Sequence, residues 1–221
     1  MPQMATTETV EKPARNGAVR DPEGTKAAIL AAATREFTEK GFGGARIDAI
    51  AAQAKINKRM LYHYYGGKEA LYVAVLEQTY AAIRSAEARL DLRHREPEAA
   101  LRELVGFTFR YFLEHPEFLS LLGTENMMRA KFLRRSEKIA AVNSPLIEEL
   151  RDVLERGASA GVFRPGADPL DVYLTMAAMG FFYLSNRWTL STVFRRDLVA
   201  KEEIARWGEH IAEVVLGYLR P

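Results

Sequence analysis

The stretch from Gly44 to Lys68, GARIDAIAAQAKINKRMLYHYYGGK, carries an unusual set of reactive side chains. Five basic residues accompany one acid, Asp48, in it: Arg46, Lys55, Lys58, Arg59 and Lys68. A thioether, a phenol and an imidazole lie among them, at Met60, Tyr62 and His63. Such a mixture suits a phosphate backbone and the base edges of a major groove. A solvated basic surface is the simpler interpretation of the charge alone.

Two short helices joined by a tight turn are expected to hold these side chains. Apolar residues recur at helical spacing over residues 47–54 and form one face of the first helix. A turn follows at Lys55 and Ile56, and Asn57 is a suitable N-cap for a second helix over residues 58–64. In the second helix only Leu61 and the ring of Tyr64 or Tyr65 face inward. The outward residues are Lys58, Arg59, Met60, Tyr62 and His63, an arrangement that favours a DNA-reading surface over a solvated face.

A longer pattern of residues surrounds these two helices. Its members are Phe37, Gly41, Phe42, Ile47, Ile50, Ala51, Ala54, Ile56, Asn57, Lys58, Leu61, Tyr62, His63, Tyr64, Tyr65, Lys68, Glu69, Ala70 and Leu71. Over residues 25–76 this pattern resembles the tetracycline-repressor (TetR) family. The resemblance implies a contact from Lys68 to a DNA phosphate, a homodimer built from the last two helices of each chain, and a small-molecule effector bound in the C-terminal half. The expected DNA-binding residues are Arg46, Asn57, Lys58, Arg59, Met60, Tyr62, His63 and Lys68.

Two positions depart from the family pattern. Arg46 stands where the family usually has a serine or threonine cap, so capping is weaker and a guanidinium is offered to phosphate. Lys55 stands where the turn glycine is usual. If the turn keeps a left-handed residue there, lysine costs on the order of 1 kcal/mol relative to glycine.

Composition excludes several classes of protein. The chain has 221 residues, of which 48% are apolar, and its net charge of +2 makes it no general polyanion binder. Without cysteine there is no disulfide or thiolate site, and the four histidines lie far apart in sequence, so we expect no metal and no cofactor. No catalytic motif occurs, and we predict no enzymatic activity. No signal peptide or long apolar run is found, which predicts a cytoplasmic protein.

The rest of the chain reads as helices, so the predicted fold class is all-α. Residues 1–20 are expected to be a disordered arm, residues 21–67 a three-helix DNA-binding domain, and residues 68–221 a larger effector-binding and dimerisation domain. Further helices are predicted over residues 22–40, 68–89, 98–114, 116–125, 146–160, 169–190 and 200–219. Three of these starts are marked by a capping residue followed by proline: Asp21-Pro22, Ser144-Pro145 and Asp168-Pro169. The basic patch of Arg134, Arg135 and Lys138 is expected to be solvated surface.

The C-terminal half contains many aromatic residues, which indicate either a filled core or a cavity. Polar residues among them favour a cavity, because ligand sites are apolar with a few polar anchors. The expected ligand-binding residues are Phe109, Phe112, Phe118, Glu125, Asn126, Arg129, Phe182, Tyr183, Asn186 and Trp188. A flat helix face at Ala177, Ala178, Met179 and Gly180, opposite a stripe that includes Trp207 and Ile211, is expected to form the dimer interface.

The function that these features predict is a sequence-specific transcriptional regulator. Its partners would be a palindromic double-stranded operator, a second copy of the chain and a small-molecule effector that releases a repressor from DNA. An all-helical enzyme or carrier that uses the aromatic cavity stays open as an alternative. A ligand-independent DNA-binding protein with a filled C-terminal core is the third possibility. The sequence names neither the effector nor the operator.

Overall fold

The computed structural model describes residues 21–221, except for the side chains of residues 140 and 142–144. The predicted arm at residues 1–20 lies outside the described residues. Helix α1 (Pro22–Gly44) begins as expected, because the side chain of Asp21 accepts a hydrogen bond of 3.1 Å from the Glu23 N–H. Its regular path is interrupted at Gly41, whose φ of 63° only glycine adopts readily. The sequence had predicted this helix end.

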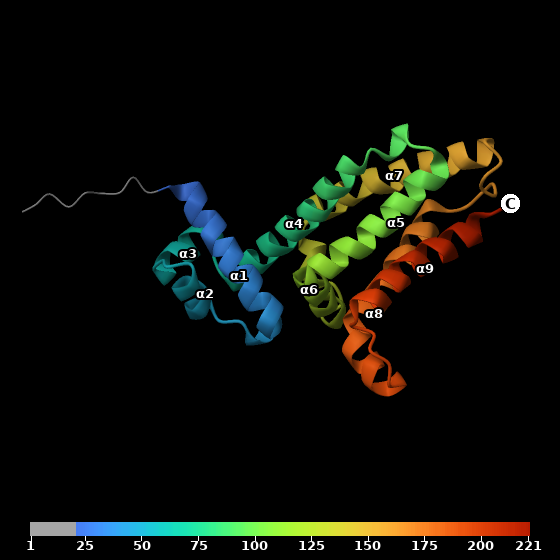
Figure 1. Cartoon of the computed structure of the whole chain (residues 1–221). Helices are drawn as coiled ribbons and strands as arrows, with labels where there is room; N and C mark the ends of the chain where they lie inside the picture. The colour runs from blue at the N-terminus through green and yellow to red at the C-terminus, as the bar shows by residue number, and fades with distance from the viewer. Residues whose placement is uncertain (1–20) are drawn as a thin grey trace, which may run out of the picture.

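Every regular element in the described part of the chain is a helix, which confirms the all-α prediction (Figure 1). After α1 come α2 (Ile47–Gln53), α3 (Lys58–Tyr65), α4 (Lys68–Glu87), α5 (Pro97–Glu114), α6 (Pro116–Met127), α7 (Glu137–Ser159), α8 (Pro169–Phe194) and α9 (Lys201–Leu219). Short 3-10 turns lie at Ala88–Leu90, Leu92–His94 and Leu133–Arg135. Among the described helices, none has the length and apolar character needed to cross a membrane.

The first core joins α1, α2 and α3 to the N-terminal half of α4. Phe37 and Leu61 are fully buried in it, and so is Tyr72 of α4, whose ring centroid lies 4.8 Å from that of Phe37. Phe132, far along the chain, fills the same core, 4.4 Å from the ring centroid of Phe42. Because residues of α4 belong to this core, the packing is continuous across residue 67. The domain boundary expected at that residue stays a prediction.

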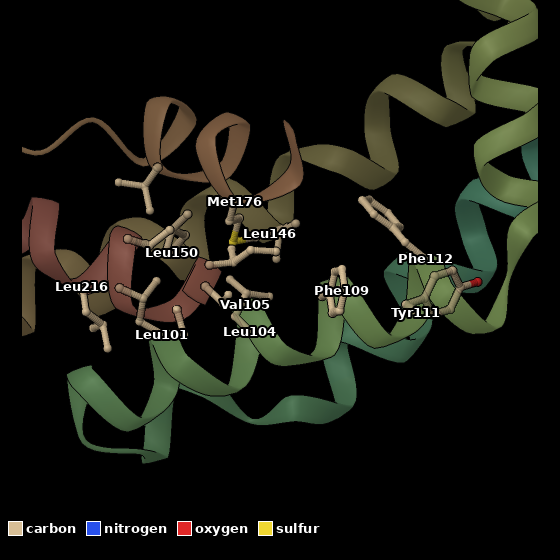
Figure 2. Close-up of a cluster of buried hydrophobic side chains, with 14 of the residues drawn as sticks. Leu101, Leu104, Val105, Phe109, Tyr111, Phe112, Leu146, Leu150, Met176 and Leu216 are labelled. Carbon is tan, nitrogen blue, oxygen red and sulfur yellow. The ribbon is translucent and has the colours of Figure 1, made fainter. Parts of the chain in front are cut away.

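The second core surrounds α5 and holds most of the predicted aromatic residues (Figure 2). Leu104, Val105 and Phe109 project from α5 toward side chains of α7, α8 and α9. Met176 comes from α8 and Leu216 from α9, and both are at least 95% buried. Side chains of α4, α7, α8 and α9 thus pack against α5 in one core. Figure 1 shows α4 running from this core to the N-terminal helices.

The sequence expectation for the start of α7 is wrong. Helix α7 does not start at Ser144-Pro145 but at Glu137, where the Ser136 hydroxyl accepts a hydrogen bond of 3.4 Å from the Ile139 N–H. Pro145 lies inside this helix. Because proline has no N–H, the carbonyl of Ala141, four residues earlier, lacks its usual helical donor. A cap-like residue before proline is therefore an ambiguous start signal when helix continues on both sides.

The small-residue stretch of α8 is divided between core and surface, because Gly180 is buried while Ala178 is exposed. A side chain at Gly180 would lie 3.5 Å from the rings of Phe109 and Phe112, so this glycine lets α8 approach α5 closely. Trp207 of α9 is also partly buried: its ring stacks on Tyr183 at 4.9 Å between centroids. Gly180 and Trp207 thus take part in internal packing, so a dimer interface on α8 and α9 has to use other, exposed residues of these helices.

Candidate nucleic-acid interface

The turn and cap that present α3 have the geometry that the sequence predicts. Lys55 adopts the left-handed conformation with φ of 54°, and Asn57 caps α3 by accepting a hydrogen bond of 2.8 Å from the Arg59 N–H. Leu61 is fully buried and anchors the helix to the core. Tyr64 and Tyr65 also pack against this core, so α3 is held along its inner side while its outward side chains can contact a partner.

The outward face of α3 displays most of the predicted DNA-binding residues. Lys58, Arg59, Tyr62 and His63 are exposed, and Met60 is half-buried. Asn57 and Arg46 are exposed beside them, at the starts of α3 and α2. This face therefore combines cations with donors and acceptors of the kind that contact phosphates and base edges.

Lys58 also links the two helices. Its Nζ lies 2.7 Å from Asp48 Oδ1, and both side chains are largely exposed. The hydrogen bond to the Asp48 carboxylate raises the pKa of Lys58 above its ordinary value. Exposed ion pairs of this kind contribute little free energy, so the ammonium can exchange Asp48 for a phosphate.

Lys68 has a different setting from the cations of α3. It is the first residue of α4 and is half-buried, with its Nζ 4.8 Å from the ring centroid of Phe42. A cation at a helix N-terminus makes an anion site, because the free N–H groups of the first turn point the same way. In sequence, Arg46 precedes the cations of α3 and Lys68 follows them, so all of these basic residues belong to the helix-turn-helix or to the helix start directly after it.

A buried carboxylate that the sequence reasoning missed supports this surface. Glu36 of α1 is fully buried and accepts hydrogen bonds from Lys40 Nζ at 2.9 Å, from the Arg46 N–H at 3.1 Å and from Gln53 Nε2 at 3.3 Å. The hydrogen bond from Lys40 is the main reason that the pKa of Glu36 lies below its usual value. Since Arg46 and Gln53 flank α2, Glu36 fixes that helix against α1. The sequence signal for this buried carboxylate was the position of a glutamate within the apolar stripe of residues 29–37.

The ten residues predicted to bind a ligand do not share one cavity. Phe109, Phe112, Phe118 and Tyr183 are buried in the second core, where Phe112 stacks on Phe118 at 5.5 Å and the Tyr183 hydroxyl donates to the Leu198 carbonyl at 2.8 Å. Phe182 and Trp188 are instead 57% and 65% exposed, because they project from the outer side of α8. The predicted aromatic residues are therefore divided between a packed core and the exposed surface of α8.

The polar members of that predicted set also point elsewhere. Glu125 is buried and accepts hydrogen bonds from the N–H groups of Phe132 (3.1 Å) and Leu133 (3.0 Å), so it holds the segment after α6. Asn126 and Asn186 each donate to a carbonyl of their own helix at 2.9 Å. Arg129 is exposed and has a left-handed backbone with φ of 56°.

Two hollows lie near these helices, and only the second includes residues of the predicted ligand-binding set, Phe182 and Tyr183. One of about 360 Å³ lies between α4 and α7 and includes Arg84, Glu87 and Glu149. The other, of about 490 Å³, lies between α8 and α9 and includes Phe182, Tyr183 and Trp207. Charged residues at inward positions of α4 were the only sequence signal for the first, and their spacing alone does not distinguish them from a solvated helix face.

This helix-turn-helix, presented by a buried core and joined to a larger helical half, defines a class of DNA-binding proteins. Residues 29–75 match the model for bacterial regulatory proteins of the tetR family, and residues 97–215 match the tetracyclin repressor-like C-terminal domain. The chain belongs to the TetR family and is a DNA-binding transcriptional regulator. The family resemblance found in the sequence is confirmed.

Its relatives include repressors of known name. The chain is 41% identical to the HTH-type transcriptional repressor NicS of Pseudomonas putida over 196 residues, covering 89% of this chain and 92% of that protein. It is 38% identical to the HTH-type transcriptional repressor SCO4008 of Streptomyces coelicolor over 172 residues, or 72% and 80% of the two chains.

Solved structures share the fold. The putative transcriptional regulator SCO4942 of Streptomyces coelicolor superimposes with a TM-score of 0.67 at 25% identity, covering 89% of this chain and 99% of that one. AibR, solved in complex with isovaleryl coenzyme A and operator DNA, gives a TM-score of 0.66 at 17% identity and covers 86% and 97%. The second likeness concerns the fold alone.

Proposed function

We propose that the protein represses transcription by binding an operator through the outward face of α3, and that a small molecule bound in the C-terminal half releases it. The observation that carries this proposal is the contrast on α3: Leu61 is fully buried, while Arg59, Tyr62 and His63 are exposed around it. A short helix with one anchor and a cationic, aromatic exterior suits a major groove.

The DNA-binding residues divide into two groups by their proposed contacts. Arg46 and Lys68, at the starts of α2 and α4, and Tyr62, on the outward face of α3, are proposed to contact phosphates, which orient the protein on the duplex. The remaining residues lie on the face of α3 or at its start and are proposed to reach the groove: Asn57, Lys58, Arg59, Met60 and His63. Sequence preference would come from this second group.

Helix α4 is the proposed connection between DNA and effector. It begins at Lys68 and ends at Glu87, so it spans from the DNA-binding helices to the second core. An effector releases DNA only if it binds the DNA-incompetent arrangement more tightly, because equal affinity for both arrangements shifts nothing. Residues 21–67 and 68–221 are the proposed functional units of this coupling, and the protein acts in it as a cytoplasmic regulator without catalysis.

The test is binding to duplex DNA flanking the protein's own gene, measured by fluorescence anisotropy over a range of salt concentrations. We expect specific binding that weakens as salt rises, because neutralised phosphates release counterions. A scrambled duplex of equal length is the control. Equal affinity for both duplexes would contradict the proposal and would favour the alternative of a small-molecule carrier.

A further inference from the structure

The hollow between α4 and α7 contains an ion pair whose hydrogen bonding is incomplete. Arg84 Nη1 lies 2.9 Å from Glu87 Oε2, and the two side chains are only 8% and 2% exposed. Among the described residues, neither Glu87 oxygen accepts a well-aligned hydrogen bond, and Arg84 Nε has no acceptor. Buried charges left in this state are costly, and a polar group that completes their hydrogen bonds would remove that cost.

The guanidinium is nevertheless held in a fixed position. Arg84 Nη2 donates a hydrogen bond of 3.1 Å to the hydroxyl of Tyr173 on α8, and the guanidinium lies 5.6 Å from the centroid of that ring. Arg84 therefore cannot turn toward solvent without breaking this contact. Its free Nε–H and the Glu87 carboxylate remain side by side among the residues that line the hollow.

Residues of α7 form the opposite wall. Ala141 and Pro145 of α7 both line the hollow. Because Pro145 has no N–H, the Ala141 carbonyl lacks its usual helical donor. Apolar atoms of Ala88, Pro145 and Leu146 form much of the remaining surface. The hollow thus offers acceptors in excess, one free donor and apolar walls in a volume of about 360 Å³, which is at the small end for a ligand site.

The charges around the hollow select against anions. Glu149 lines it together with Arg84 and Glu87, so above the pKa of Glu87, about 7, two carboxylates accompany one guanidinium. An anionic ligand would meet more repulsion than attraction. A neutral molecule with an N–H group beside a carbonyl would instead donate to Glu87 and accept from Arg84 Nε.

We propose that this hollow is the effector site and that it takes a small uncharged molecule with an amide or lactam edge. The inference rests on the proposed function, since it identifies the site and ligand class of the effector named there. It also indicates how effector binding would reach the DNA-binding helices. Arg84 and Glu87 are in the last turn of α4, and this helix begins at Lys68, the proposed phosphate contact (Figure 1). A ligand that draws α7 toward these residues would reposition α4.

The test uses three probes with the same ring and different polar edges: benzamide, acetophenone and benzoate. Benzamide has both a donor and an acceptor, acetophenone has only the acceptor, and benzoate is an anion without a donor. Binding to the intact protein is measured by isothermal titration at millimolar probe concentration and about pH 8, above the pKa of Glu87, so that this side chain is ionised. We expect benzamide to bind most tightly, by about tenfold over acetophenone, since the hydrogen bond to Glu87 involves a charged partner. Tighter binding of benzoate, or equal binding of all three, would overturn the ligand class.

Two variants test the location. Ala141 is exposed and lines the hollow, so Ala141→Trp is expected to block benzamide without disturbing the core. Ala82→Trp, at another exposed position on α4, is the matched control and should bind benzamide normally. Glu87→Gln keeps the shape of the side chain and is expected to weaken benzamide binding about tenfold. Unchanged binding in both Ala141→Trp and Glu87→Gln would overturn the site.

The same preparations are assayed for specific duplex binding, which separates the two proposals. Absence of specific duplex binding by the wild type contradicts the proposed function. Specific duplex binding together with no benzamide binding contradicts the effector site alone.

Discussion

Tyr62 and Lys68 lie outside the cores and are proposed to contact phosphate, so each can be removed without a cavity. We predict that Tyr62→Ala and Lys68→Ala weaken binding to all duplexes alike, and that Lys68→Ala lowers the salt slope by about 1. Leu61→Ala is the contrast: it should lower the free energy of unfolding by roughly 2 to 5 kcal/mol, because Leu61 is fully buried. Anisotropy and urea unfolding measure the two effects. Unchanged salt slope and affinity in both surface variants would contradict the assignment.

Glu87 gives the protein a characteristic pH dependence. Burial raises the pKa of Glu87 from 4.5 to about 7, with Glu149 adding to the rise and Arg84 opposing it. The folded protein therefore keeps a proton that the unfolded chain releases, and the free energy of unfolding falls as pH rises from about 4.5 to 7. The Glu87 contribution amounts to about 3 kcal/mol at most.

We predict that Glu87→Gln removes this contribution, because the amide has no proton to lose. Urea unfolding of both proteins at about pH 5 and pH 8 measures it as the difference between their pH slopes. Comparing slopes cancels the other titrating groups, which both proteins share. A wild-type stability that falls no more steeply than that of Glu87→Gln would contradict the assignment.

At the scale of the element, the turn between α2 and α3 carries a measurable strain. Lys55 has φ of 54°, which disfavours residues with a Cβ, and its side chain is exposed. We predict that Lys55→Gly raises the free energy of unfolding by about 0.5 to 1 kcal/mol, less than the full strain because glycine also loses more entropy on folding. Urea unfolding measures this change. Lys55→Ala, which keeps the Cβ, is the control and should bring no such gain.

Helix starts with a local cause could be predicted from the sequence, and those with a distant cause could not. Asp21, Asn57 and Asp168 cap their helices through their own side chains, so short patterns were sufficient. The pattern at Ser144-Pro145 was misleading, because tertiary packing extends α7 through the proline. Local pattern predicts a cap, but only the neighbouring helices decide whether a chain continues past it.

The DNA-binding face was more predictable than the ligand site for a similar reason. The α3 residues are adjacent in sequence, so one helical period places them on one face. Arg84, Tyr173 and Pro145 come from three helices, and their proximity depends on how α4, α7 and α8 pack. The aromatic residues behaved in the same way: Phe112 and Phe182 look alike in sequence, yet one is buried and the other exposed.

At the scale of the whole molecule, contacts after α6 tie the C-terminal half to α4. The basic patch is exposed, as expected, and two of its members also form ion pairs: Arg135 Nη1 lies 2.6 Å from Glu69 Oε2, and Lys138 Nζ lies 3.0 Å from Glu77 Oε2. Phe132, in the same segment, is fully buried in the first core. A movement of α6 or α7 therefore reaches α4 through packed side chains and ion pairs together, which supports coupling between the two halves.

The outer face of α8 and α9 is the surface on which a second copy is expected to dock. Leu170 and Leu174 on α8 are 49% and 53% exposed, and Val214 and Tyr218 on α9 are 38% and 46% exposed. Each pair is four residues apart, so each forms a stripe along its helix. Helices α8 and α9 pack against each other, as the stacking of Tyr183 on Trp207 shows, so the two stripes belong to adjacent helices.

This apolar face leads to the prediction for the assembly. A helix-turn-helix needs two copies about one DNA turn apart to read a palindrome, and exposed apolar stripes on adjacent helices supply a self-complementary surface. We predict that Leu174→Arg gives monomers in sedimentation velocity and weakens operator binding at least tenfold, because a charge would be buried at the centre of the interface. Gln78→Arg, at an exposed position on α4, should stay dimeric. A Leu174→Arg protein that sediments as a dimer, or a wild type that is monomeric at micromolar concentration, would exclude this face as the interface.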